Sequence, residues 1–187
     1  MNKTHERIKN MTVCALFAAI ICLLSPHSIP IGPIPITLAT FAVSFSAVVL
    51  GWKRGSLAVI LYLLIGSIGL PVFSGYKAGV SVLLGVTGGY ATSYIFMALI
   101  IGFAADLKFK KLPLKIVSLA AGLLLSLFVL YAMGTVQYVL ITHSDVRAAL
   151  AACVLPFMPF DTMKLIAASV LGSAAREALV RAKIYAH

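Results

Sequence analysis

Two charged residues, Asp161 and Lys164, could do chemistry because they lie in a segment that is otherwise apolar. They follow the run Leu-Pro-Phe-Met-Pro-Phe at positions 155–160. Positions three apart lie on one face of a helix, so the carboxylate and the ammonium can meet each other or converge on one ligand. Ionisable residues inside a membrane segment indicate a functional site. A salt bridge that neutralises itself inside a helix bundle is the structural alternative.

The prolines beside this pair predict the helix that would position it. Pro156 and Pro159 end any preceding helix and favour a new one that begins near Phe160. Asp161 then falls in the first turn, where the helix dipole stabilises a carboxylate, and Lys164 falls on the next turn. We expect the pair to anchor a small ligand, with Asp161 accepting N–H bonds and Lys164 donating to a carbonyl or a carboxylate.

The composition places this helix in a membrane. Of the 187 residues, 61% are hydrophobic and 11% are charged, a balance typical of an integral membrane protein. Apolar runs recur along the whole length, which predicts a single domain, 1–187. The expected fold is an all-α bundle of six transmembrane helices with long structured outer loops. The expected spans are 8–24, 37–50, 55–70, 90–105, 114–141 and 160–179.

The net charge of +10 could suggest nucleic acid, but the basic residues lie between the apolar runs. Four groups alternate with connections that hold only Lys77 and Arg147, which is the positive-inside pattern. It predicts that both termini are cytoplasmic and that the basic residues contact membrane lipid headgroups rather than nucleic acid. The four groups are Lys3, Arg7 and Lys9; Lys53 and Arg54; Lys108, Lys110, Lys111 and Lys115; and Arg176, Arg181 and Lys183.

Two outer connections are unusual. Residues 25–36 contain four prolines among apolar residues, which predicts an extended loop that folds back as a lid on a cavity or as a plug against the bilayer surface. Residues 69–90 are rich in glycine, which lets the backbone approach a ligand closely, and carry the rings and hydroxyls of Tyr76 and Tyr90. With the charged pair, these loops describe a mostly apolar pocket on the outer side.

Other chemistries find little support in the sequence. No nucleophile with a base, carboxylate pair or histidine cluster lies within the spans, so we expect neither an enzyme nor a catalytic residue. The cysteines and histidines show no metal-ligand spacing, and no cofactor is expected. A stand-alone ion- or proton-coupled carrier is the alternative, because Asp161 and Lys164 could relay charge. The chain shows no inverted repeat of the kind that many carriers use.

A stripe of small residues marks the first span. Ala15 and Ala19 are four positions apart, a spacing that lets another helix approach closely in a membrane. The stripe could pack against another helix of the same chain or dock to a partner subunit.

Four stretches, taken together, resemble the BioY family, the biotin-specific substrate-binding (S) components of energy-coupling factor (ECF) transporters. The resemblance implies capture of biotin from outside the bacterial cell membrane. It also implies association with a transmembrane coupling subunit and two ATPase subunits, for which Ala15 and Ala19 would be the docking face. The stretches are Ile31-Gly32-Pro33-Ile34-Pro35-Ile36-Thr37-Leu38, Ile68-Gly69-Leu70-Pro71-Val72-Phe73, Gly85-Val86-Thr87-Gly88-Gly89-Tyr90 and Leu155-Pro156-Phe157-Met158-Pro159-Phe160-Asp161-Thr162-Met163-Lys164.

The chain departs from the family pattern at two positions, with Ala39 where Gln is frequent and Val86 where Pro is frequent. Polar contacts from the second span are therefore expected to be reduced or supplied by Thr37 or Thr40. Biotin offers two ureido N–H groups to Asp161, while Lys164 suits either the ureido carbonyl or the carboxylate. The expected ligand-binding residues are Thr40, Phe73, Tyr76, Gly89, Tyr90, Asp161 and Lys164.

Overall fold

The computed structural model describes residues 3–31, 34–107 and 111–182. Lys108, Lys110 and Lys183, which belong to the predicted basic groups, lie outside the described residues. The elements in chain order are α1 (Lys3–Leu24), β1 (Ser28–Ile31), β2 (Ile34–Thr37), α2 (Ala39–Ser67), a 3-10 turn (Ser74–Tyr76), α3 (Val80–Leu84), α4 (Gly88–Asp106), α5 (Leu112–Thr142), α6 (Val146–Cys153) and α7 (Met158–Arg181).

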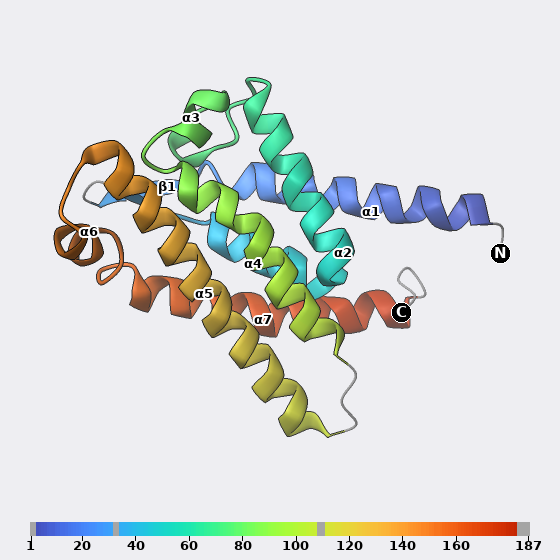
Figure 1. Ribbon diagram of the computed structural model, residues 1–187. Coiled ribbons are helices and arrows are strands. Elements are labelled where there is room, and N and C mark those ends of the chain that lie inside the picture. The colour runs from blue at the N-terminus through green and yellow to red at the C-terminus, as the bar shows by residue number, and fades with distance from the viewer. Residues whose placement is uncertain (1–2, 32–33, 108–110, 183–187) are drawn as a thin grey trace.

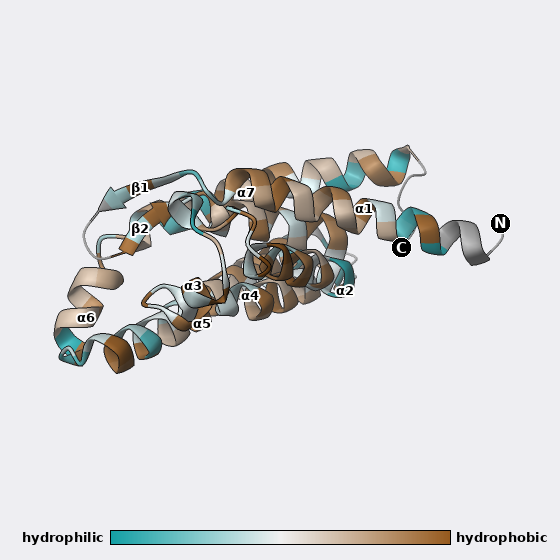
Figure 2. Cartoon of the chain, turned by 90° about the horizontal axis from the view of Figure 1, so that it is seen from above, coloured by the Kyte–Doolittle hydropathy of each residue, from teal (hydrophilic) through white to brown (hydrophobic). Residues whose placement is uncertain are grey.

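The two ends of the molecule differ in structure. Both chain termini lie at one end, and the strands, α3 and α6 gather at the other (Figure 1). α2 packs against α1, α4 and α7, and α4 packs against α5, so α2 and α4 form the centre of the bundle. Hydrophilic residues concentrate toward the two ends, and the middle of the helices is mostly hydrophobic (Figure 2).

Several helices are long and apolar enough to cross a membrane. Within the described residues these are α1, α2, α4 and α5, and the bent pair α6 and α7 counts as a fifth if it is one span. The axes of α6 and α7 differ by 50° at the break that contains Pro156. α7 begins at Met158, so Asp161 lies in its first turn as the prolines predicted. The chain is a multi-pass helical membrane protein.

Gly51 breaks α2, in which the sequence predicted two spans. Its φ of 74° and ψ of −178° are not helical, and glycine adopts such a positive φ without strain. A Cβ atom on Gly55 would lie 3.0 Å from the Cα of Ala47, whereas eight residues of straight helix span about 12 Å. The two halves of α2 therefore fold back on each other at Gly51.

A partly buried ion pair holds this reversal, and it corrects the prediction that Arg176 contacts lipid headgroups. Arg176 is buried; its guanidinium pairs with Asp106 and donates to the carbonyls of Val48 (3.0 Å) and Ala105 (3.1 Å). The other Asp106 oxygen accepts the backbone N–H of Trp52 at 3.1 Å. Arg176 therefore joins α7 to α2 and to the end of α4 instead of anchoring the surface.

The proline-rich connection is a β-hairpin, whereas the sequence predicted a loop in an all-α fold. β1 and β2 pair antiparallel, with Ser28 opposite Thr37 and Pro30 opposite Pro35. Proline lacks a backbone donor, which keeps this two-stranded ladder short. The hairpin lies against the pocket described next, to which β2 contributes residues.

Candidate functional site

A cavity of about 660 Å³, including the open space at its mouth, lies between the helices near the hairpin end. Its volume is within the range of small-molecule sites, and its walls are mostly apolar with a few polar groups. Elements from β2 to α7 contribute to it. The lining residues are Ile34, Pro35, Ile36, Thr37, Ala39, Thr40, Tyr62, Phe73, Ser74, Val82, Thr87, Tyr90, Ala91, Tyr94, Leu130, Tyr131, Cys153, Phe157, Asp161 and Lys164.

The carboxylate of Asp161 is the centre of the polar corner. Its Oδ1 accepts from the Thr40 hydroxyl at 3.1 Å and pairs with Lys164 Nζ at 2.6 Å. Its Oδ2 accepts from the Tyr131 hydroxyl at 2.9 Å. Asp161 is 6% exposed, so these donors replace water around a buried charge. The three partners fix the direction in which the carboxylate faces the cavity.

Lys164 connects this corner to the hairpin. Its ammonium donates to the backbone carbonyl of Thr37 in β2 at 2.8 Å, in addition to pairing with Asp161. Thr37 also accepts the N–H of Ala39 through its side-chain oxygen at 3.1 Å, at the start of α2. The ammonium therefore holds the last residue of β2 next to α7.

Aromatic side chains form much of the wall. Tyr62 comes from α2, Tyr90 and Tyr94 from α4, and Tyr131 from α5. Phe73 packs edge-on against Tyr62, with ring centroids 5.6 Å apart. Aromatic rings offer flat apolar surfaces, and the tyrosines add hydroxyls at fixed places. This wall suits a small, mostly apolar ligand.

Of the seven residues predicted to bind ligand, five line the cavity. They are Thr40, Phe73, Tyr90, Asp161 and Lys164.

Gly89 does not line the cavity. A Cβ atom there would overlap the backbone carbonyl of Met133, so the missing side chain allows α4 to approach α5 closely. Gln137 joins α5 to the glycine-rich connection before α4, because its amide donates to the carbonyls of Leu83 (2.9 Å) and Gly85 (2.8 Å).

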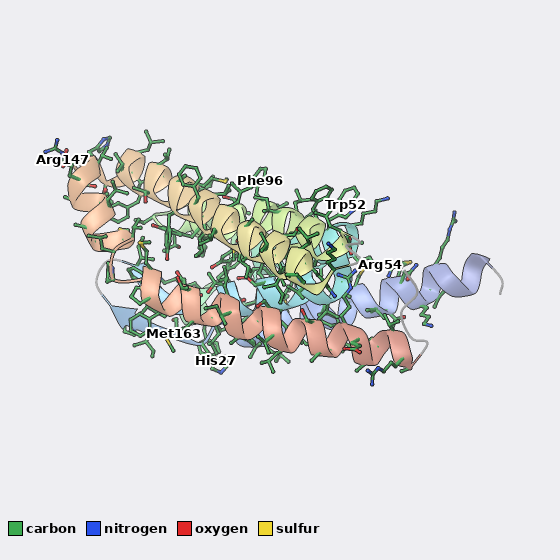
Figure 3. All side chains as sticks on the ribbon, turned by 90° about the horizontal axis from the view of Figure 1, so that it is seen from below. His27, Trp52, Arg54, Phe96, Arg147 and Met163 are labelled. Carbon is green, nitrogen blue, oxygen red and sulfur yellow. The ribbon has the colours of Figure 1, made fainter. Side chains whose placement is uncertain are left out.

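Tyr76 lines a second hollow, of about 860 Å³ including open space, on the outside of the hairpin. Its ring contacts His27 with centroids 5.9 Å apart. The two hollows share Ile36, Thr37 and Lys164, so the charged corner forms part of the boundary between them. His27 and Met163 lie on the same side of the molecule in Figure 3.

Three tyrosines line the cavity but were absent from the predicted set: Tyr62, Tyr94 and Tyr131. Tyr62 and Tyr94 lie inside long apolar runs, where an aromatic residue is usual in a helix bundle. Tyr131 belongs to a polar and aromatic side of the fifth predicted span, a weak signal that did not indicate Asp161 as its partner. Tyrosine hydroxyls in a membrane helix need partners, and that requirement could have indicated a polar cavity.

Ala15 and Ala19 lie apart from the cavity. Both are exposed, on a helix that packs mainly against α2. Among residues 3–31, 34–107 and 111–182, the surface that they form is therefore exposed.

The fold and the cavity define a class, the multi-pass membrane proteins that bind a small molecule between helices near one face. The model of the BioY family matches residues 1–181, and the chain belongs to this family. The Thermotoga maritima protein described as "Biotin transporter BioY" is 39% identical over 164 residues, which cover 88% of this chain and 94% of that protein. "Biotin transporter BioY2" of Lactococcus lactis subsp. cremoris is 36% identical and covers 97% of both chains.

A solved structure shares the fold. The S-component for biotin from an ECF-type ABC transporter superposes with a TM-score of 0.81 at 27% sequence identity, and the match covers 95% of each chain. The similarity extends over the helices that build the cavity.

Proposed function

We propose that this chain is the high-affinity biotin-binding membrane component of an ECF transporter and captures biotin from the outer side of the membrane. The observation that carries the proposal is a largely apolar cavity with one charged corner, formed by Asp161 and Lys164, in a chain that belongs to the BioY family. The chain is thus a transport protein and not an enzyme.

The chemistry of biotin fits this cavity. The fused rings and the aliphatic tail are apolar and suit the walls formed by Phe73 and Tyr90. The ureido N–H groups would donate to Asp161, which Thr40 and Tyr131 hold in place. Lys164 would then donate to the ureido carbonyl. A ligand that replaces one internal partner of each charge keeps both charges hydrogen-bonded.

The membrane arrangement follows from the kink in α2. If each half of α2 crosses the membrane, the chain has six spans in one domain, 1–187, with both termini on one side. Figure 3 supports this, because Trp52 and Arg54 lie toward the end of the molecule that carries the termini and Arg147 lies toward the other. The positive-inside rule places the end with Arg54 in the cytoplasm, and the cavity outside, in a bacterial cell membrane.

The partners would be a transmembrane coupling subunit and two ATPase subunits. Ala15 and Ala19 present small side chains on the exposed face of α1, and such a face lets a helix of another subunit approach closely. The rest of the bundle surface faces lipid.

Calorimetry on the purified chain in detergent tests the ligand. We expect tight biotin binding, and no heat of binding would reject the proposal. Uptake of biotin into proteoliposomes, with and without the coupling module and ATP, separates a receptor from a carrier. Uptake by the chain alone, driven by a proton gradient, would favour the alternative of a stand-alone carrier.

Tryptophan at Ala15 and at Ala19 tests the docking face. We expect the double variant to bind biotin normally but to lose ATP-driven uptake and co-purification with the coupling subunit, because large rings prevent close helix contact. Leu124→Trp on α5 is the matched control, since Leu124 is also exposed. Unchanged uptake in the alanine variants would remove this surface as the docking face.

A further inference from the structure

Ser74 is a polar residue of the cavity whose hydroxyl has no partner in the part of the chain that the structure describes. Its Oγ atom is buried and makes no hydrogen bond within residues 3–31, 34–107 and 111–182. Two other hydroxyls share this property in that part of the chain, those of Ser25 and Thr135, but neither residue lines the cavity. A buried hydroxyl without a partner is costly, so its presence beside a cavity indicates a partner that enters the cavity.

The surrounding loop holds Ser74 in a fixed position. On one side, the N–H of Phe73 donates to the carbonyl of Lys77 at 3.0 Å. On the other side, the N–H of Gly75 donates to the carbonyl of Pro26 at 3.0 Å. The Phe73 ring lies against Tyr62, which anchors the loop to α2. The hydroxyl is therefore positioned before a ligand arrives, which lowers the entropic cost of binding.

The backbone of this loop carries strain. Tyr76 has a φ of 59°, in the left-handed region, and Gly75 has a φ of 69°. Non-glycine residues in this region are uncommon and cluster at ligand-binding segments. The strained turn directs residue 74 toward the cavity while Tyr76 faces the outer hollow.

The pose proposed above decides which part of the ligand Ser74 would meet. In that pose the ureido group occupies the charged corner, because its N–H groups donate to Asp161 and its carbonyl accepts from Lys164, which is already paired with Asp161 at 2.6 Å. The ligand's own carboxylate must then lie elsewhere in the cavity, beside a donor that is not already engaged. The Ser74 hydroxyl is such a donor.

We infer that Ser74 donates a hydrogen bond to the carboxylate of the bound ligand and selects for ligands that end in a carboxylate. This inference rests on the proposed function, since it takes biotin as the ligand. A hydroxyl bonded to an anion contributes more than a neutral pair, so loss of the hydroxyl is expected to weaken binding roughly 10- to 100-fold.

The test compares two ligands on two variants of the full chain in detergent. Calorimetry measures biotin and an analogue in which a methyl group replaces the carboxylate. We expect Ser74→Ala to raise the Kd for biotin by the factor above and to leave the Kd for the analogue unchanged. Ser46→Ala is the control, because Ser46 is also buried but its hydroxyl is bonded to the carbonyl of Ala42 at 2.7 Å, outside the cavity.

Thermal unfolding of the ligand-free variants completes the test. Ser74→Ala removes no hydrogen bond among the described residues and relieves a buried hydroxyl that lacks a partner there, so we expect its midpoint to be equal to or above that of the unaltered chain. An unchanged Kd for biotin, or an equal loss for both ligands, would overturn the inference while leaving the proposed function in place. Failure of the unaltered chain to bind biotin would overturn both.

Discussion

Replacing Asp161 by Asn asks whether the carboxylate binds ligand or only neutralises Lys164. In the ligand-free protein it accepts from Lys164 at 2.6 Å, from Tyr131 at 2.9 Å and from Thr40 at 3.1 Å. Asn retains one acceptor oxygen and places an NH₂ donor where the second oxygen was. At least one of the three donors therefore loses its partner, and the buried ammonium loses its counter-charge.

The expected magnitudes follow from burial. Removing one partner of a buried ion pair costs about 3–5 kcal/mol of unfolding free energy. The side chain of Lys164 is 15% exposed and keeps the Thr37 carbonyl at 2.8 Å, so we expect the lower end, about 3 kcal/mol. Loss of a charged acceptor for a ureido N–H costs a further 1.5–3 kcal/mol, roughly a 10- to 150-fold weaker Kd.

The assay pairs biotin calorimetry with thermal unfolding in the same detergent. A double variant, Asp161→Asn with Lys164→Met, separates the two roles because it removes both charges and leaves no unpaired ammonium. We expect it to regain most of the stability but not the affinity. If the double variant binds biotin as tightly as the unaltered chain, the pair is a structural salt bridge and the ligand role is refuted. Wild-type affinity in Asp161→Asn alone would have the same meaning.

Two further variants test the end of the molecule that carries the termini. Gly51→Ala should lower the unfolding midpoint more than Gly69→Ala, since both positions have positive φ but only at Gly51 would a Cβ atom overlap the carboxylate of Asp106; equal shifts would contradict this. Arg176→Gln should cost about 3 kcal/mol of unfolding free energy, the lower end for a buried pair because the Asp106 side chain is 30% exposed, against about 0–1 kcal/mol for Arg181→Gln in an exposed pair, without changing the Kd for biotin. A large change in Kd for Arg176→Gln would show that the two ends are coupled.

Local rules predicted the helix that carries the charged pair. The start of α7 near Pro159 and the contact between Asp161 and Lys164 depend only on residues a few positions apart. Proline preferences and the i, i+3 spacing are sufficient for such features.

The remainder of the corner depends on tertiary packing. Thr40 and Thr37, which bind Asp161 and Lys164, are 121 and 127 positions away along the chain, and Tyr131 is 30 positions from Asp161. The sequence indicates that such hydroxyls need partners but not which helices will be adjacent. Thr37 accepts the hydrogen bond from Lys164 through its backbone carbonyl. Every residue has this group, so the side-chain types could not predict the contact.

The amino-acid composition of β1 and β2 did not predict that they form a hairpin. Prolines at 30 and 35 weaken any strand prediction, because each removes a ladder donor. In the structure the two prolines face each other, so the missing donors fall at the same step of the ladder. An alternating pattern of Pro and Ile thus remains compatible with a short hairpin.

The two ion pairs, Asp161 with Lys164 and Asp106 with Arg176, show that a charge in an apolar segment is not enough to identify a binding site. Each pair includes a side chain less than 10% exposed, Asp161 in one and Arg176 in the other. Arg176 pairs with Asp106 and donates hydrogen bonds to two backbone carbonyls at the end of the bundle. Asp161 instead lies on the wall of a cavity, where a ligand can take the place of an internal partner. The adjoining cavity, rather than the burial of the charges, distinguishes a binding pair from a structural one.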